Sequence, residues 1–381
     1  MKQKKNPFIF GKLVKGDSFC NRKQEIKEIK QYIADRYSVW LYSPRRYGKS
    51  SLIYRVFREL NDVKLIYLDL YNVFSTDDFC RKYSKLLANE LFDWKDDIKI
   101  LTKKMTKYFQ NLYPKISFDE TGTPSFSLEV KQIADMADIE RILKIPGIIA
   151  KEKKQPICVA FDEFQEIERI DPFMINWMRS VFQTQENVSY IFLGSKQSLM
   201  RNIFSSVNSP FYEFAVKMDI KPISHNDLFE FIKSKFEQQK LQVSDKTIDD
   251  ILRVSECHPH FTQYFASVVF DIIRSGMSDD SDNFKDFWIE KIINSQSVIF
   301  QNIYDQLKNN QRRVLSLLAI TDDKSELFSE KTRAKYQLPA SSSINTILKA
   351  LMKKDLIQKT DRTYKIINPV LKAWLKQISE K

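Results

Sequence analysis

The chain has 381 residues and a mass of 45.1 kDa, a size that predicts two or three domains. Hydrophobic residues make up 43% and charged residues 29%, which excludes global disorder, and only 7 glycines are present, which excludes a glycine-rich fibrous protein. The net charge is +12, a value that fits a polyanionic partner as well as a lysine-rich solvated surface.

The four cysteines form no CxxC pair and there are only three histidines, so neither a disulfide framework nor a zinc site is expected. No apolar run approaches the ~20 residues that cross a bilayer. We therefore expect a cytoplasmic protein with no membrane partner.

Short apolar strands alternate with helices over the first half of the chain. In chain order we predict helix Glu25–Tyr37, strand Ser38–Tyr42, helix Lys49–Leu60, strand Lys64–Leu70, helix Thr76–Leu91, helix Asp93–Pro114, a polar excursion or hairpin over Lys115–Val130, helix Asp135–Ala150, strand Ile157–Phe161, helix Phe173–Gln183 and strand Val188–Gly194. This alternation is typical of an α/β fold with a parallel sheet.

The turn between the first predicted strand and its following helix reads SPRRYGKSS. A strand, a tight turn and a helix start in this order form the context of a phosphate-binding P-loop, in which backbone N–H groups and the helix N-terminus attract phosphate. Ser43 stands at the first glycine position of the pattern GxxxxGK[ST], and a chance GKS at a helix start is the alternative. The residues expected to hold a nucleotide are Ser43, Pro44, Arg45, Arg46, Tyr47, Gly48, Lys49, Ser50 and Ser51.

Each part of this turn has an expected role. Gly48 permits close approach of the backbone, Lys49 neutralises the β- and γ-phosphates, and the Ser50 hydroxyl is a ligand for Mg²⁺. ATP and Mg²⁺ are thus the expected cofactors.

A second motif is the strand Ile157–Phe161 with the acid pair that follows it. Carboxylates at the carboxyl end of a buried parallel strand lie at the ligand crevice of an open α/β sheet. Asp162 is expected to hold Mg²⁺, and Glu163 to deprotonate the attacking water. Ser195 follows the strand Val188–Gly194 and reaches the γ-phosphate or the water if that strand lies beside the acid-bearing one; otherwise it belongs to an ordinary turn.

These motifs together resemble the archaeal-type ATPases, a signal-transducing (STAND), AAA+-related group of P-loop ATPases. The resemblance rests on residues 43–52 (SPRRYGKSSL), 161–167 (FDEFQEI) and 192–196 (FLGSK). It implies that Asn21 and Arg22 belong to an N-terminal box near the adenine, and that Pro259 belongs to a helical lid that senses the nucleotide. It also implies that ATP binds between core and lid. Arg179 and Arg201 are candidates for an arginine finger, and a homo-oligomer or a protein partner stays open.

Beyond Ser224 the pattern becomes helical, which predicts a core over residues 1–223, a helical lid over 224–299 and a third domain over 300–381. In the third domain, helices over Gln311–Ile320, Ser329–Tyr336 and Ser341–Lys354 precede a hairpin over Leu356–Ile367, an order that resembles a winged helix-turn-helix. Residues 308–376 contain 15 Lys and Arg against 6 Asp and Glu. Double-stranded DNA is therefore an expected partner, with Ser341–Lys354 as recognition helix and Lys359, Arg362 and Lys365 on the wing; packing against the core or against another protein is the alternative.

Three functions remain open from the sequence. The first is a nucleotide-dependent switch with slow ATP hydrolysis. The second is an ATP-driven remodeller or loader of nucleic acid. The third is a non-enzymatic winged-helix DNA-binding protein with a structural ATP site.

Overall fold

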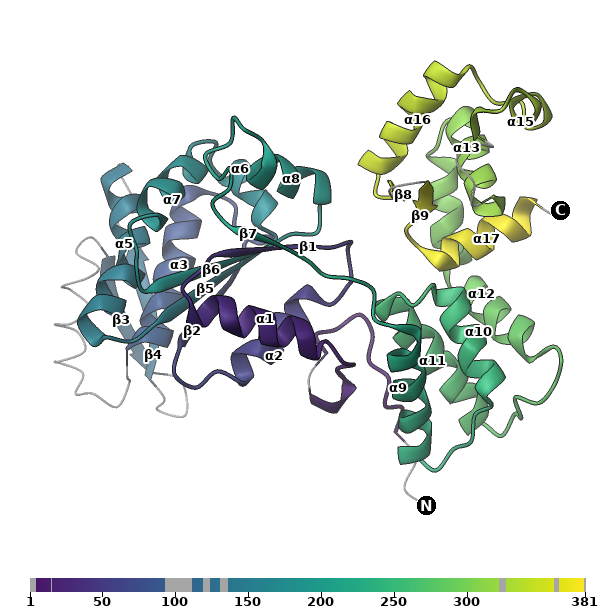
Figure 1. Cartoon of the computed structure of the whole chain (residues 1–381), viewed down its shortest axis with the longest axis horizontal. Helices are drawn as coiled ribbons and strands as arrows, with labels where there is room; N and C mark the ends of the chain where they lie inside the picture. The colour runs from purple at the N-terminus through teal and green to yellow at the C-terminus, as the bar shows by residue number, and fades with distance from the viewer. Residues whose placement is uncertain are drawn as a thin grey trace. The chain divides into compact units, whose positions relative to one another are not determined.

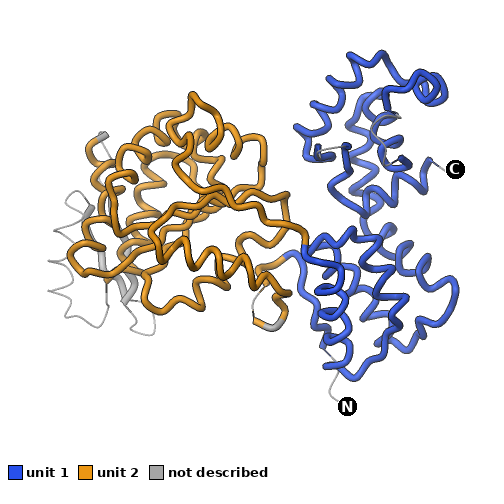
Figure 2. The backbone as a smooth tube through the Cα atoms, viewed as in Figure 1, with its two compact units in different colours: residues 1–11, 223–381 blue, residues 12–222 orange. Residues whose placement is uncertain are grey.

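The computed structural model describes residues 5–14, 16–92, 112–118, 124–130, 136–321, 327–359 and 363–379. The chain divides into two compact units, one of residues 12–222 and one of residues 1–11 together with 223–381 (Figure 2). The chain therefore passes between the two units twice. Within the described residues, no helix combines the length and the apolar character that crossing a bilayer requires.

The first unit is built on a parallel sheet of five strands in the order β2-β5-β6-β1-β7 (Figure 1). The strands are β1 (Val39–Tyr42), β2 (Lys64–Asp69), β5 (Ile157–Asp162), β6 (Val188–Leu193) and β7 (Val216–Asp219). Its helices are α1 (Lys23–Ala34), α2 (Lys49–Arg58), α3 (Thr76–Leu91), α5 (Met136–Lys153), α6 (Ile167–Ile170), α7 (Met174–Phe182) and α8 (Gln197–Ser205), with short 3₁₀ turns η1 (Gly16–Ser18) and η2 (Phe164–Glu166).

Both faces of the sheet are buried, because alternate side chains of each strand point to opposite faces. Val39 and Leu41 pack with helices α1 and α2, whereas Trp40 between them joins the core formed with α3, α5, α7 and α8. All six residues of β5 and all six of β6 are buried. This explains why these strands appear in the sequence as continuous apolar runs. The predicted parallel α/β fold is confirmed.

The segment between α3 and α5 contains an antiparallel hairpin of β3 (Leu112–Phe118) and β4 (Pro124–Val130). The hairpin prediction for Lys115–Val130 is thus confirmed. The helix predicted over Asp93–Pro114 falls outside the described residues for positions 93–111. It is wrong at its end, where residues 112–114 belong to β3.

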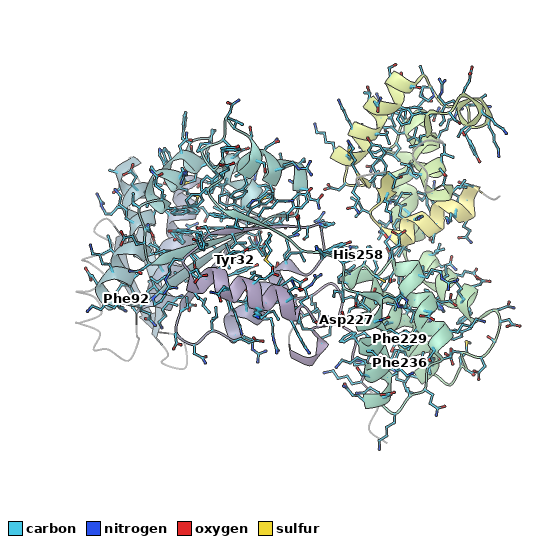
Figure 3. All side chains as sticks on the ribbon, viewed as in Figure 1. Tyr32, Phe92, Asp227, Phe229, Phe236 and His258 are labelled. Carbon is cyan, nitrogen blue, oxygen red and sulfur yellow. The ribbon has the colours of Figure 1, made fainter. Side chains whose placement is uncertain are left out.

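The second unit is helical apart from one small hairpin. Its elements are α9 (His225–Gln238), α10 (Asp245–Ser255), α11 (Pro259–Arg274), α12 (Phe284–Asp305), α13 (Asn309–Ile320), α15 (Glu330–Lys335), α16 (Ser341–Lys353), β8 (Ile357–Lys359), β9 (Tyr364–Ile366) and α17 (Pro369–Ser379). The N-terminal segment belongs here because Phe8 packs against Phe236 and Phe270, with ring centroids 5.6 and 6.1 Å away, and Asn6 Nδ2 donates to the Ser267 carbonyl at 3.0 Å. Figure 3 labels Phe229 and Phe236 on α9 of this unit.

The C-terminal elements have the predicted order of three helices and a hairpin, with β8 and β9 pairing antiparallel. Arg362, expected on the wing, lies outside the described residues. Helix α12 runs without a break through the predicted domain boundary at residues 299 and 300, and the three-domain division stays a prediction. Helix α17, which closes the module, was not predicted.

Candidate functional site

The turn between β1 and α2 has the backbone geometry that a phosphate-binding loop needs. Gly48 adopts φ +81°, a left-handed conformation that glycine takes without steric cost, and α2 begins directly after it. The α2 N-terminus therefore follows the loop, with its first N–H groups free of helical partners. Ser43 is buried at the start of the turn, whereas Arg45 and Arg46 are exposed at its tip.

The Lys49 side chain folds back over this loop. Its Nζ donates to Ser43 Oγ at 3.2 Å and to the Pro44 carbonyl at 3.1 Å, and the residue is only 7% exposed. Burial lowers the pKa of Lys49 to about 8, although the charges of Asp162 and Glu163 act in the opposite direction. Burial and repulsion by Arg45 also lower the pKa of Arg46. The loop thus brings together the positively charged side chains of Arg45, Arg46 and Lys49.

The acid pair lies against this loop, as predicted. Ser50 Oγ donates to Asp162 Oδ2 at 2.6 Å, so the P-loop and the end of β5 meet at one point. Asp162 is 8% exposed, and its Oδ1 accepts the Glu163 backbone N–H at 2.9 Å. Ser50 and Asp162 together present oxygen ligands on the edge of the sheet where the strands end.

The role predicted for Ser195 required its strand to lie beside the acid-bearing strand. The sheet satisfies this condition, because β6 pairs with β5 on one side and with β1 on the other. Ser195 Oγ donates to Glu163 Oε2 at 2.7 Å, and Gln165 Nε2 donates to the same oxygen at 2.5 Å. Glu163 itself adopts φ +51°, an uncommon conformation for a residue other than glycine. The two donors hold one oxygen of this carboxylate in a fixed position.

Three residues of this site were missed from the sequence: Tyr67, Asp69 and Gln165. The Tyr67 hydroxyl donates to Asp162 Oδ2, and burial followed by the Asp162 charge raises the pKa of Tyr67 well above its usual range. Asp69 pairs with Asp162 in the register of β2 and β5; burial is the main cause that raises the pKa of Asp69. The sequence signals were Asp69 near the end of the run KLIYLDL and the position of Gln165 in FDEFQEI.

The other predicted nucleotide ligands have defined partners. Ser51 Oγ accepts the Val14 N–H at 3.1 Å, and Asn21 Oδ1 accepts the Lys23 N–H at 3.4 Å. Arg22 is 4% exposed and hydrogen-bonds to protein groups, including the Tyr47 carbonyl. Pro259 is the first residue of α11 in the second unit. All the other predicted site residues, Asp162 and Glu163 included, belong to the first unit.

The two candidates for an arginine finger contact aromatic rings of the first unit. The Arg179 guanidinium carbon lies 4.6 Å from the ring centroid of Phe214, and that of Arg201 lies 5.5 Å from the ring centroid of Tyr42. These cation–π contacts give each side chain a structural partner in its own unit.

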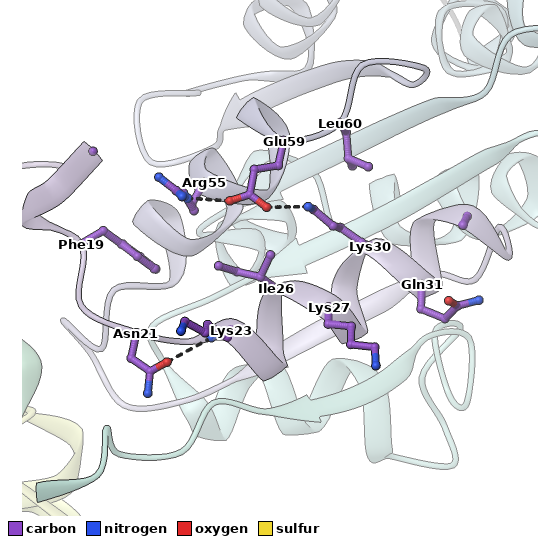
Figure 4. Close-up of a pocket in the computed structure, with 12 residues that line it drawn as sticks. Phe19, Asn21, Lys23, Ile26, Lys27, Lys30, Gln31, Arg55, Glu59 and Leu60 are labelled. Atoms are coloured by element: carbon purple, nitrogen blue, oxygen red, sulfur yellow. Dashed lines mark hydrogen bonds and ion pairs between the residues drawn. The ribbon is translucent and has the colours of Figure 1, made fainter. Parts of the chain in front are cut away.

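A groove of about 750 Å³ runs between α1 and α2 (Figure 4). Its walls include Phe19, Asn21, Lys23 and Lys27. Glu59 also lines the groove and forms ion pairs with Lys30 and Arg55. No residue of the loop 43–50 and neither acid of the pair lines it, so the groove is separate from the phosphate-binding turn.

The residues at the P-loop fit a magnesium ion that is shared with phosphates. Mg²⁺ prefers oxygen ligands and is usually held by one or two carboxylates together with substrate phosphates. Ser50 and Asp162 supply one hydroxyl and one carboxylate within 2.6 Å of each other. Among the described residues, no group of three or more His, Cys, Asp or Glu side chains could hold a metal without such phosphates.

The parallel sheet, the P-loop and the acid pair define a protein of the P-loop ATPase class. Residues 19–263 match the family described as an ATPase domain predominantly from Archaea, and the chain belongs to this family. Residues 298–377 match a probable winged helix domain. The predicted family and fold are thus confirmed.

Solved structures show the same fold over nearly the whole chain. A Walker-type ATPase of Pyrococcus abyssi superposes with a TM-score of 0.66 at 18% identity, covering 97% of this chain and 99% of that one. The ORC2 protein of Aeropyrum pernix, in ADPNP–ADP complexes, superposes with a TM-score of 0.51 at 11% identity, covering 94% and 95%. No curated protein matches the chain in sequence.

Proposed function

We propose that this protein binds ATP and hydrolyses it slowly, as a nucleotide-dependent switch. The observation that carries the proposal is the 2.6 Å hydrogen bond between Ser50 of the P-loop and Asp162 of β5. It joins the phosphate-binding turn to the end of β5, where the acid pair of the motif DEFQE lies. The ADPNP–ADP complexes named for the Aeropyrum pernix ORC2 protein, which shares the fold, agree with ATP as the nucleotide.

The chain's own residues account for binding and for activation of water. The loop amides around Gly48 and the α2 N-terminus take the β-phosphate, and protonated Lys49 neutralises the charge that develops on the transferred phosphate. Mg²⁺, when held by Ser50 and Asp162, supplies further neutralisation of the phosphates. Glu163 accepts the proton of the attacking water through its second oxygen, since Ser195 and Gln165 occupy the first.

The resulting hydrolysis is expected to be slow. The two candidates for an arginine finger, Arg179 and Arg201, contact aromatic rings of their own unit. A stabilising arginine is worth about 10³–10⁵ in rate where one is present. A protein without it remains in its ATP state for long periods, which suits a switch.

The test is ATP turnover and ATP affinity of the wild type and of Lys49→Ala. We expect nucleotide binding and measurable turnover in the wild type, both strongly reduced in the variant. Arg58→Ala, a change of the same charge at the other end of α2, is the matched control. Absence of heat on adding Mg-ATP to the wild type in calorimetry would contradict the proposal.

A second proposal concerns double-stranded DNA as the partner of the C-terminal module. Helix α16 exposes a row of polar and basic residues without one acid: Ser342, Ser343, Asn345, Thr346, Lys349 and Lys353. Such residues contact base edges and phosphates in the major groove. Its opposite face, with Ile344, Leu348 and Leu351, is buried.

Measuring turnover with and without duplex DNA separates the alternatives. Stimulation by DNA favours an ATP-driven remodeller or loader. Tight ATP binding with no turnover, unchanged by Glu163→Gln, favours a DNA-binding protein with a structural ATP site. ATP-dependent assembly without a DNA response favours a switch that acts on a protein partner or on a second copy.

A further inference from the structure

We infer that Arg22 is a positioning residue that couples the P-loop to the point where the chain leaves the first unit, and that it does not contact the nucleotide. The inference rests on the proposed ATP-binding function. It changes the role expected for this residue from a ligand to a link between two backbone segments.

The Arg22 guanidinium joins the first turn of α1 to two segments that are distant in sequence. Nη1 donates to Glu25 Oε1 and to the Lys221 carbonyl, both at 2.7 Å, and Nη2 donates to the Tyr47 carbonyl at 3.2 Å. With 4% of its surface exposed, the residue is enclosed by these partners. A planar guanidinium can serve several acceptors in fixed directions, which a lysine ammonium on a flexible stem cannot reproduce.

The bond to Tyr47 has a direct consequence for phosphate binding. Tyr47 precedes Gly48, and in a trans peptide the C=O and the following N–H point in opposite directions. Because Arg22 holds the Tyr47 carbonyl on its own side, the Gly48 N–H points to the other side of the loop. Arg22 thereby pre-orients an amide that we propose as a phosphate donor.

The bond to Lys221 reaches the boundary of the unit. The first unit consists of residues 12–222, so Lys221 is its last residue but one before the chain enters the second unit. The adjacent Ile220 N–H donates to the Tyr42 carbonyl at 2.9 Å, at the residue where β1 ends and the P-loop begins. A displacement of the chain at residues 221–222 would therefore reach the P-loop through the Arg22 side chain as well as through this backbone bond.

The backbone conformation of Arg22 indicates that the surrounding structure fixes this residue in place. Arg22 has φ +73° and Asn21 before it has φ +48°, so two consecutive residues other than glycine adopt left-handed conformations. Such a conformation is strained for a residue other than glycine and persists only where the surrounding structure fixes it. Helix α1 starts immediately afterwards, with the Ile26 N–H donating to the Arg22 carbonyl at 2.9 Å.

The test compares the wild type with Arg22→Lys, which keeps the charge and loses the fork, and with Lys27→Ala as a control on the exposed face of α1. We expect Arg22→Lys to raise the KM for ATP about tenfold while kcat stays within about twofold, because the pre-oriented amide binds substrate and transition state alike. Lys27→Ala should leave both constants unchanged. A KM equal to that of the wild type would overturn the inference.

Hydrogen exchange gives a readout that does not depend on ATP binding. Without nucleotide, Arg22→Lys should accelerate exchange at residues 219–223, and Lys27→Ala should not. In the wild type, ATP should slow exchange there, and this effect should disappear in Arg22→Lys. If the variant raises KM but exchanges at 219–223 as the wild type does, Arg22 acts as a direct ligand and the inference is wrong. If the wild type binds no ATP, the proposed function fails, while exchange of the nucleotide-free proteins still decides whether Arg22 holds the junction.

Discussion

Ser195 Oγ lies 2.7 Å from Glu163 Oε2 and donates a hydrogen bond to it. The two residues follow neighbouring parallel strands, β6 and β5, so the sheet itself brings them together. Gln165 donates to the same oxygen, and its own Oε1 lies buried with no hydrogen-bond partner among the described residues. The acid proposed to activate water is thus held from one side by two neutral donors.

Replacing Glu163 by Gln should separate binding from chemistry. The amide keeps the size of the side chain but cannot accept the proton of water, so turnover should fall about 10²–10⁴-fold while ATP affinity changes little. Single-turnover hydrolysis and calorimetric titration measure the two quantities. Glu168→Gln, an exposed acid five residues further on, is the control; equal loss of turnover in both variants would remove Glu163 from this role.

Gly194 should not tolerate a larger side chain. A Cβ built at this residue would lie 2.5 Å from Gln165 Oε1 and would also overlap Met200. Gly194→Ala should therefore displace Gln165, destabilise the protein by about 1–3 kcal/mol and reduce turnover more than ATP affinity. Thermal unfolding measures the stability, and separate determination of kcat and of the ATP dissociation constant distinguishes turnover from affinity. If the free energy of unfolding of Gly194→Ala equals that of the wild type, the added methyl group fits beside Gln165 and this prediction is wrong.

The P-loop and the acid pair could be predicted because each is a contiguous motif at a strand end. Ser195 could be predicted only under a condition on strand order, which the pairing of β6 with β5 satisfies. Tyr67 and Asp69 could not, because their role depends on the register that places β2 beside β5, with Asp69 opposite Asp162. Register between strands nearly ninety residues apart in sequence leaves no local signal.

The elements missed from the sequence have equally physical causes. Strand β7 is a short edge strand in which only Met218 is buried, so it has no apolar run. Helix α12 runs through the predicted domain boundary at residues 299 and 300, where Val298 and Ile299 are 73% and 58% exposed and interrupt the apolar pattern of the helix. The contacts of Arg22 with the Tyr47 and Lys221 carbonyls depend on tertiary structure, since these two acceptors come from segments distant in sequence.

Tyr67→Phe should weaken the response to Mg²⁺. The hydroxyl that it removes orients the Asp162 carboxylate, and loss of a group that orients a metal ligand commonly costs about 10–100-fold in metal affinity. We expect the Mg²⁺ concentration for half-maximal ATPase activity to rise by at least about tenfold. Tyr54→Phe, whose ring lies 4.7 Å from that of Tyr67, is the matched control, and an equal shift in both variants would indicate lost packing.

Helix α16 should lose affinity for duplex DNA when its charge is reversed. Each phosphate contact contributes about 0.9 to the slope of log affinity against log salt. Lys349→Glu with Lys353→Glu should weaken binding at all sequences and lower this slope by about 2. A single charge reversal, Lys27→Glu in α1, should have no effect on DNA binding. Equal affinities for all three proteins in fluorescence anisotropy would exclude α16 as the DNA-binding surface.

Lys49 should make both stability and ATP binding depend on pH. Burial lowers its pKa to about 8 from an ordinary 10.5, so between these values the unfolded chain binds more protons than the folded one. The free energy of unfolding of the nucleotide-free protein should accordingly rise with pH over this window, by up to about 3 kcal/mol from this group. Lys49→Met should abolish that rise.

ATP binding should raise the pKa of Lys49, whereas burial lowers it. The phosphates favour the charged lysine, so at pH 8, where about half of the nucleotide-free protein carries the proton, binding should take up about half a proton. Titration calorimetry in buffers of different ionisation enthalpy measures this uptake, and ATP affinity should decline as pH rises above 8. Zero uptake at pH 8 would mean that Lys49 is already fully charged before the nucleotide arrives.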